Sequence, residues 1–192
     1  FWKGGGQGCD NMVFVTLGTG VGGGIVIGGH LLHGTHGSGA EIGHMVLNRN
    51  ETAVCGCGKR GCLEQYASAN GIVRLAKRIL SQCDTPSHLR ELDTFTSKDI
   101  CDLAREGEEM ASAILDRCAN YLGLAMSYVS CTTDPQVFIV GGGMSRAGTV
   151  LTNAVARHYR QYAFHASIQT PIVIASLGND AGIYGCAAMV LK

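Results

Sequence analysis

One histidine and three cysteines lie at the spacing of metal ligands. They follow the pattern H-x10-C-x-C-x4-C, formed by His44, Cys55, Cys57 and Cys62. Thiolate and imidazole groups suit tetrahedral zinc, and four protein ligands leave no position open for water. The pattern therefore predicts a structural zinc site. Three reduced cysteines in a mobile loop, or a disulfide, are the alternatives that the spacing leaves open.

A glycine-rich segment precedes these residues and reads L-G-T-G-V-G-G-G over positions 17–24. Glycines permit close backbone approach, so successive N–H groups can point at a phosphate, and Thr19 can add a hydroxyl donor. The segment is not a Walker loop, because no Gly-Lys-Ser/Thr follows. Nor is it the dinucleotide fingerprint, because a strand follows it. Taken alone, it fits a tight turn as well as a nucleotide site.

A second glycine run, Gly141-Gly142-Gly143, follows the apolar segment Val137–Val140. The apolar segment is typical of a buried parallel strand. Turns after the carboxyl ends of such strands are where α/β folds bind ligands. The run is therefore a second candidate for a ligand-binding turn.

The elements that must position these groups alternate between strand and helix after an opening hairpin. Apolar runs and turn residues predict strands, and periodic apolar faces with caps predict helices. Residues from His33 to Gly61 are rich in Gly, polar residues and Cys, which indicates an irregular insertion that needs a staple or a function. This alternation indicates an α/β fold. The expected strands are 12–17, 25–27, 137–140 and 172–175, and the expected helices are 72–80, 97–105, 110–129, 148–162 and one from about 180 to the end.

Composition excludes several classes of protein. The chain has 192 residues, 46% of them hydrophobic and 16% charged, with zero formal net charge. This is enough for one domain with a real core, and it offers no basic patch for nucleic acid. No apolar run approaches the ~20 residues of a membrane span. Three of the nine cysteines are clustered, which favours metal binding in a reducing compartment, and we expect a cytoplasmic protein.

Together these segments resemble the ROK family of sugar kinases and repressors. The resemblance is carried by the glycine segment 17–24, G-A-E-I-G-H at 39–44, C-G-C-G-K-R-G-C-L-E at 55–64 and V-G-G-G at 140–143. Within the family, the ROK-type bacterial glucokinases resemble the chain most. The resemblance implies an actin-like, ribonuclease-H-like ATPase fold of two lobes. Residues 1–192 would form the carboxy-terminal lobe, with a zinc- and sugar-binding insertion at 33–66.

The resemblance also implies an activity, the transfer of a phosphoryl group from MgATP to the 6-hydroxyl of a hexose. Glu41 and Glu64 would hydrogen-bond sugar hydroxyls, and His44 would both ligate zinc and contact the sugar. Glucose is the first choice; mannose, N-acetylglucosamine, N-acetylmannosamine and fructose remain open. A homodimer is expected for the intact protein. The implied nucleotide-binding residues are Gly18, Thr19, Gly20, Val21, Gly22, Gly23, Gly141 and Gly142.

The resemblance implies that the general base lies outside this chain. Family kinases carry it as the Asp of an Asn-Asp-Ala-Asn motif, just before the segment that matches Phe1. Asp180, in Asn-Asp-Ala-Gly, imitates the motif, but it opens the last expected helix, where Asp favours capping. Asp10 merely precedes the first strand. We therefore expect Phe1 to be a cut inside a longer protein, the amino-terminal lobe to be absent, and the chain alone to be inactive.

Two other functions compete with the kinase. One is a sugar-responsive ROK repressor, whose helix-turn-helix would lie outside the chain. A repressor need not keep Thr19 and its glycines, and this chain keeps all of them. The other is a stand-alone zinc module, which would not explain two glycine-rich strand ends.

Overall fold

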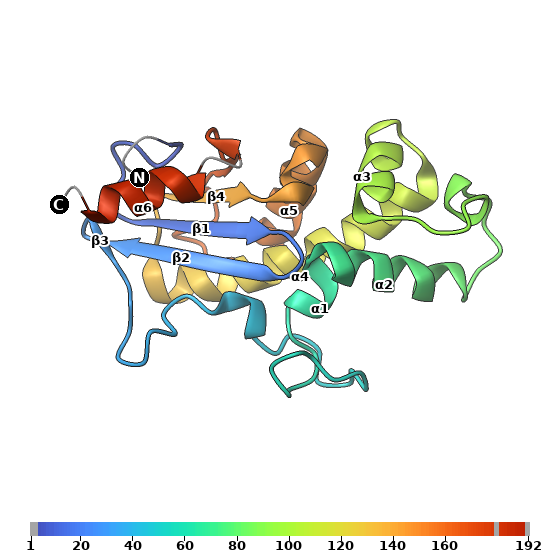
Figure 1. The fold of residues 1–192 in the computed structure, drawn as a ribbon, viewed down its shortest axis with the longest axis horizontal. Helices are drawn as coiled ribbons and strands as arrows, with labels where there is room; N and C mark the ends of the chain where they lie inside the picture. Colours follow the sequence, from blue (N-terminus) through green and yellow to red (C-terminus); the bar gives the residue numbers. More distant parts are fainter. Residues whose placement is uncertain (1–3, 179–180, 191–192) are drawn as a thin grey trace.

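The computed structural model describes residues 4–178 and 181–190, and its centre is a mixed five-stranded sheet (Figure 1). The strand order is β3-β2-β1-β4-β5. β1 pairs antiparallel with β2 and parallel with β4, and β5 extends the parallel half. The mixed α/β sheet agrees with the expected fold class. The strands are β1 (Met12–Leu17), β2 (Val21–Ile27), β3 (His30–Leu31), β4 (Val137–Gly141) and β5 (Ile172–Ile174).

Alternating side chains of β1 divide the core between the two faces of the sheet. Val13, Val15 and Leu17 are fully buried on the face that also receives the helices. Met12 belongs to a smaller cluster on the other face, with Val26, Val137 and Ile139. Burial on both faces explains why the sequence of this strand is almost continuously apolar.

The longer helices form because their apolar positions recur at helical spacing, and side chains cap the first turns of α2, α3 and α4. Ser68 accepts from the N–H of Gly71 at the start of α2, and Thr96 forms a capping box with Asp99 at the start of α3. α4 packs against α5, α3, α2 and α1 and is about 37 Å long. In Figure 1 it runs behind the sheet toward α2 and α3. The helices are α1 (Glu64–Ala67), α2 (Ala69–Leu80), α3 (Ser97–Arg105), α4 (Glu109–Thr133), α5 (Thr149–Tyr162) and α6 (Ala181–Val190).

The second strand differs from the sequence-based expectation. It begins at Val21, so the glycines at 22–24 lie within β2 and do not precede it. Thr16 pairs with Gly22 in the antiparallel ladder, and a Cβ at Gly23 would overlap the carbonyl oxygen of Ala40. Gly23 therefore permits close packing of the insertion against the sheet, which turn-based reasoning did not anticipate.

The insertion at 33–66 is mostly irregular, as expected, but it contains two short helical segments. The 3-10 helix η1 (Ile42–His44) presents His44, and α1 begins at Glu64. Asp180 and the first residues, Phe1 and Trp2, lie outside the described residues. No helix within the described ranges is long and apolar enough to cross a membrane.

Candidate metal and phosphate site

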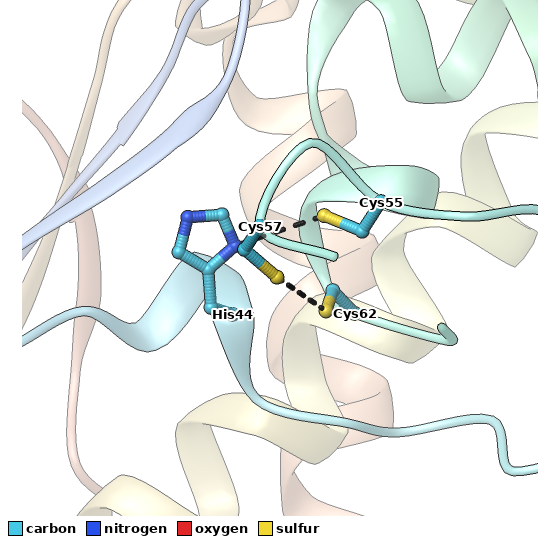
Figure 2. Close-up of side chains that lie close together, drawn as sticks. All are labelled: His44, Cys55, Cys57 and Cys62. Carbon is cyan, nitrogen blue, oxygen red and sulfur yellow. Dashed lines mark hydrogen bonds between the residues drawn. The ribbon is translucent and has the colours of Figure 1, made fainter. Parts of the chain in front are cut away.

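The four predicted metal ligands converge at one point. The ligand atoms of His44, Cys55, Cys57 and Cys62 all lie within 4.8 Å of one another (Figure 2). Sγ of Cys57 and Sγ of Cys62 are 3.6 Å apart, and Sγ of Cys55 is 3.8 Å from Nδ1 of His44. Two sulfurs bound to a tetrahedral zinc lie about 3.8 Å apart. The donor set and its spacing therefore fit zinc.

Backbone pairing and one amide side chain hold this loop in shape. Val46 pairs with Cys62, and Val54 pairs with Arg60, in two isolated bridges. Oε1 of Gln65 accepts from the N–H groups of Gly61 and Cys62 at 2.7 and 3.1 Å, and its Nε2 donates to the carbonyl of Ala53. The loop is thus tied to α1 by groups that are not metal ligands.

The thiols of the cluster differ in their environments. Burial, together with the neighbouring thiols of Cys57 and Cys55, raises the pKa of Cys62 to about 12. A backbone hydrogen bond from Lys59 lowers the pKa of the exposed Cys57. Zinc binds thiolates, so a bound ion would have to displace the proton of the buried Cys62.

The histidine can serve two partners because its two ring nitrogens face different ways. Nδ1 of His44 is the atom near Cys55, and Figure 2 shows the other ring nitrogen on the side away from the sulfurs. A metal on Nδ1 would leave Nε2 available for a second hydrogen bond. This geometry is compatible with the dual role expected from the sequence.

The glycine segment forms the hairpin turn between β1 and β2. We call residues 17–21 the phosphate hairpin. The N–H of Gly18 donates to the carbonyl of Gly20 at 3.0 Å, and the N–H of Ala69 donates to the carbonyl of Gly18 at 2.8 Å. Thr19 is exposed at the tip. The start of α2 therefore holds the hairpin from one side.

The second glycine run lies beside this hairpin. β1 and β4 are parallel neighbours, with Thr16 opposite Gly141, so their carboxyl ends share one edge of the sheet. Gly142 has φ +85°, and a Cβ there would press on the backbone of Leu17. Only glycine meets both requirements. Both predicted phosphate or nucleotide segments thus lie at one edge.

Glu64 lies between the metal cluster and the phosphate hairpin. Its Oε2 accepts from the N–H of Val21 at 3.2 Å, and its Oε1 is 3.9 Å from Sγ of Cys55. A Cβ at Gly43 would overlap the carbonyl of Val21, so the segment before the cluster also packs tightly on the hairpin. The sequence did not predict that a sugar-binding candidate would touch the hairpin.

The other acidic candidates have simpler surroundings. The side chain of Glu41 is exposed and makes no hydrogen bond within the described residues, so it is available to a ligand. Asp10 precedes β1 at the strand end opposite the hairpin, roughly 20 Å away for a six-residue strand. The length of β1 therefore separates Asp10 from the hairpin.

Sequence reasoning missed a buried carboxylate behind the metal loop. Glu51 is 7% exposed and faces Tyr66 and two arginines of α2, Arg74 and Arg78. These residues line a cavity with a volume of about 180 Å³. The sequence did contain a signal, since Arg74 and Arg78 are four residues apart and lie on one face of a helix. Two arginines on a face that is covered by other residues require an acidic partner.

A family model described as the ROK family matches residues 1–192, which is the whole chain. The chain belongs to the ROK family. It is 40% identical over 188 residues to a glucokinase of Halalkalibacterium halodurans, covering 96% of this chain and 57% of that relative. The ROK chain described here therefore spans little more than half the length of this curated relative.

Two solved structures of ROK proteins share the fold. One is a ROK family glucokinase from Streptomyces griseus in complex with glucose and AMPPNP, with a TM-score of 0.85 and 34% identity, covering 96% of this chain and 61% of that one. The other is a ROK family transcriptional regulator, a homologue of the E. coli MLC protein, with a TM-score of 0.82 and 28% identity. It covers 91% of this chain and 44% of the regulator. Both likenesses, with the mixed sheet, fit an actin-like kinase fold.

Proposed function

We propose that residues 1–192 are the carboxy-terminal lobe of a two-lobed sugar kinase that phosphorylates a hexose, glucose first, at its 6-hydroxyl with MgATP. The observation that carries the proposal is the position of Glu64. Its carboxylate lies between the metal cluster at Cys55 and the phosphate hairpin at Val21. A sugar held there would lie beside the hairpin that receives phosphate. The similarity to glucokinases supports the same conclusion.

The metal in this proposal is a structural zinc held by His44, Cys55, Cys57 and Cys62. Bound zinc would supply a fixed cross-link between η1 and the cysteine loop, and all four of its positions would be filled by protein. Its effect on the sugar would be indirect. By fixing the ring of His44, the cross-link would orient Nε2 toward the sugar.

The sugar would be held by charged hydrogen bonds. Glu41 and Glu64 accept hydrogen bonds from sugar hydroxyls in this proposal, and His44 adds a third polar contact. A hydrogen bond to a charged group contributes about 1.5–3 kcal/mol. Because Glu41 is exposed and has no partner within the described residues, it can accept a sugar hydroxyl without breaking an existing bond.

The nucleotide would be held mainly by backbone. N–H groups over Gly18–Gly23 would face the phosphates, Thr19 would add a hydroxyl, and Gly141 and Gly142 would approach the adenosine. Phosphoryl transfer depends largely on positioning and on neutralising charge, which backbone donors and Mg²⁺ supply. The general base that takes the proton of the 6-hydroxyl belongs, in this proposal, to a segment outside the chain. The intact protein would be a cytoplasmic homodimer.

The test compares MgATP-dependent glucose phosphorylation by the complete protein and by residues 1–192 alone, with mannose, fructose and the N-acetyl sugars assayed in parallel. Turnover by the complete protein and none by the chain alone is the expected result. Comparable turnover by the chain would show that the base lies within it, and Asp180 would be the first residue to replace.

The second candidate is a sugar-responsive repressor, which the likeness to a ROK family transcriptional regulator favours. A complete protein that binds DNA, releases it on adding sugar and phosphorylates no sugar would establish this function in place of the kinase. The intact phosphate hairpin favours the kinase.

A further inference from the structure

Gly20, at the turn of the phosphate hairpin, lies directly against the carboxylate of Glu64. A Cβ built at Gly20 would overlap Oε2 of Glu64, and the three nearest atoms that it would meet all belong to that side chain. The same Oε2 accepts the N–H of Val21, the next residue in the hairpin. Two successive hairpin residues therefore define where this carboxylate lies.

The hairpin itself cannot retreat easily. The N–H of Ala69 donates to the carbonyl of Gly18, and the turn closes on itself through the bond from Gly18 to Gly20. The segment around Gly43 also packs on the carbonyl of Val21. Glu64, by contrast, meets Gly20 with the far end of a flexible side chain. A methyl group at position 20 would therefore displace the carboxylate and leave the backbone in place.

We propose that Gly20 is a positioning residue for sugar binding, because its missing side chain leaves the space in which the Glu64 carboxylate is held by the N–H of Val21. The inference rests on the proposed function, since it assumes that Glu64 binds a sugar. It assigns to the hairpin a role beyond the nucleotide: its turn shapes the sugar site even when no nucleotide is bound. Both oxygens of a carboxylate accept hydrogen bonds. Oε2 can therefore keep its hydrogen bond from the N–H of Val21 while Oε1 accepts a hydrogen bond from a sugar hydroxyl.

The test measures glucose binding by calorimetry on the complete protein, without nucleotide, for wild type and Gly20→Ala. We expect the dissociation constant for glucose to rise roughly tenfold or more, as for a misplaced charged hydrogen bond. The matched control is Gly24→Ala in β2, where an added Cβ would meet only Cβ of Phe14, at 3.9 Å. It should bind glucose within about twofold of wild type.

A double-mutant cycle separates this effect from general disturbance. In a Glu64→Ala background no carboxylate remains to be displaced, so Gly20→Ala should change glucose binding by less than about twofold. An equal penalty in both backgrounds, or wild-type binding by Gly20→Ala, would overturn the proposal. If Gly20→Ala does not fold, Glu64→Asp replaces it in the test. A carboxylate one methylene shorter loses the hydrogen bond from the N–H of Val21 and should weaken glucose binding similarly. Wild-type glucose binding by this variant would also overturn the proposal. A wild-type protein that binds no sugar would instead refute the proposed function itself, a result that differs from either variant outcome.

Discussion

The hydroxyl of Tyr66 donates a 2.6 Å hydrogen bond to the buried carboxylate of Glu51. Arg74 and Arg78 reach the same oxygen at 3.1 and 3.4 Å, and the N–H groups of Thr52 and Ala53 donate to the other. Protein donors thus replace the hydrogen bonds from water that both oxygens of Glu51 lose on burial. These bonds connect the metal loop to α1 and α2. Tyr66 lies on α1 two residues after Glu64, which the proposed sugar site requires.

Replacing Glu51 with Gln should lower the free energy of unfolding by about 2–3 kcal/mol. The amide loses the charge that the two arginines compensate, and it leaves buried polar groups poorly paired. Chemical denaturation monitored by circular dichroism measures the change. The neighbouring Thr52→Ala, at an exposed side chain, serves as control and should stay within about 0.5 kcal/mol. Equal effects of the two variants would show that the network adds no stability.

The same carboxylate should make stability depend on pH in the acid range. Burial acts to raise the pKa of Glu51, but hydrogen bonds from Tyr66 and Ala53 and the charge of Arg74 outweigh it and lower the pKa from 4.5 to about 2. A lowered folded-state pKa adds stability above the unfolded-state pKa and loses it as pH falls toward the folded one. The stability difference between wild type and Glu51→Gln should therefore shrink from pH 4.5 to 2. A difference that stays constant over this window would contradict the assignment.

Purified protein should contain one zinc per chain, measured by elemental analysis. Cys57→Ser should lower the zinc content and the melting temperature, because structural zinc contributes directly to the folding of its loop. The control is Cys131→Ser, at an exposed cysteine on α4 outside the cluster, which should keep both. Protein without zinc, or with a disulfide between Cys57 and Cys62, would rule the metal site out.

Glu41→Gln in the complete protein should raise the KM for glucose roughly tenfold and leave the KM for ATP unchanged. Its exposed side chain makes no contact with the hairpin among the described hydrogen bonds, so the lost interaction is with sugar alone. Steady-state kinetics with each substrate varied measures the split. Glu106→Gln, a surface control at the end of α3, should match wild type. Parallel increases in both KM values would assign Glu41 to the structure of the site.

Local signals in the sequence predicted much of the fold. The apolar run Met12–Leu17 is β1 to the residue, and Ser68 and Thr96, two residue types typical of helix caps, cap α2 and α3. These features depend on neighbours within one or two turns. The predicted start of β2 was wrong because glycines have low strand propensity, and the close approach of Gly23 to Ala40 joins residues 17 positions apart and leaves no local signal.

The candidate site also combines features that local sequence signals predicted with contacts that they could not predict. The spacing of the three cysteines predicted a cluster that the structure brings together, and parallel pairing brought Gly142 to the hairpin. Glu51 could not be assigned, because a single Glu in a polar loop has the pattern of a solvated residue until its partners on α2 are placed. The contact between Glu64 and Val21 spans 43 residues and has no local signature.

The central helix α4 has a consequence for the order in which backbone amides exchange with solvent. Tyr121 stacks on Tyr66 with ring centroids 3.9 Å apart, and two residues later Gly123 lies against the backbone of α5 at Tyr159. Opening α4 therefore requires separating α1 and α5 from it, which is close to unfolding the whole lobe. Its central amides should exchange with deuterium last, at the rate set by global unfolding, while those in the connection at 84–93 exchange by local opening.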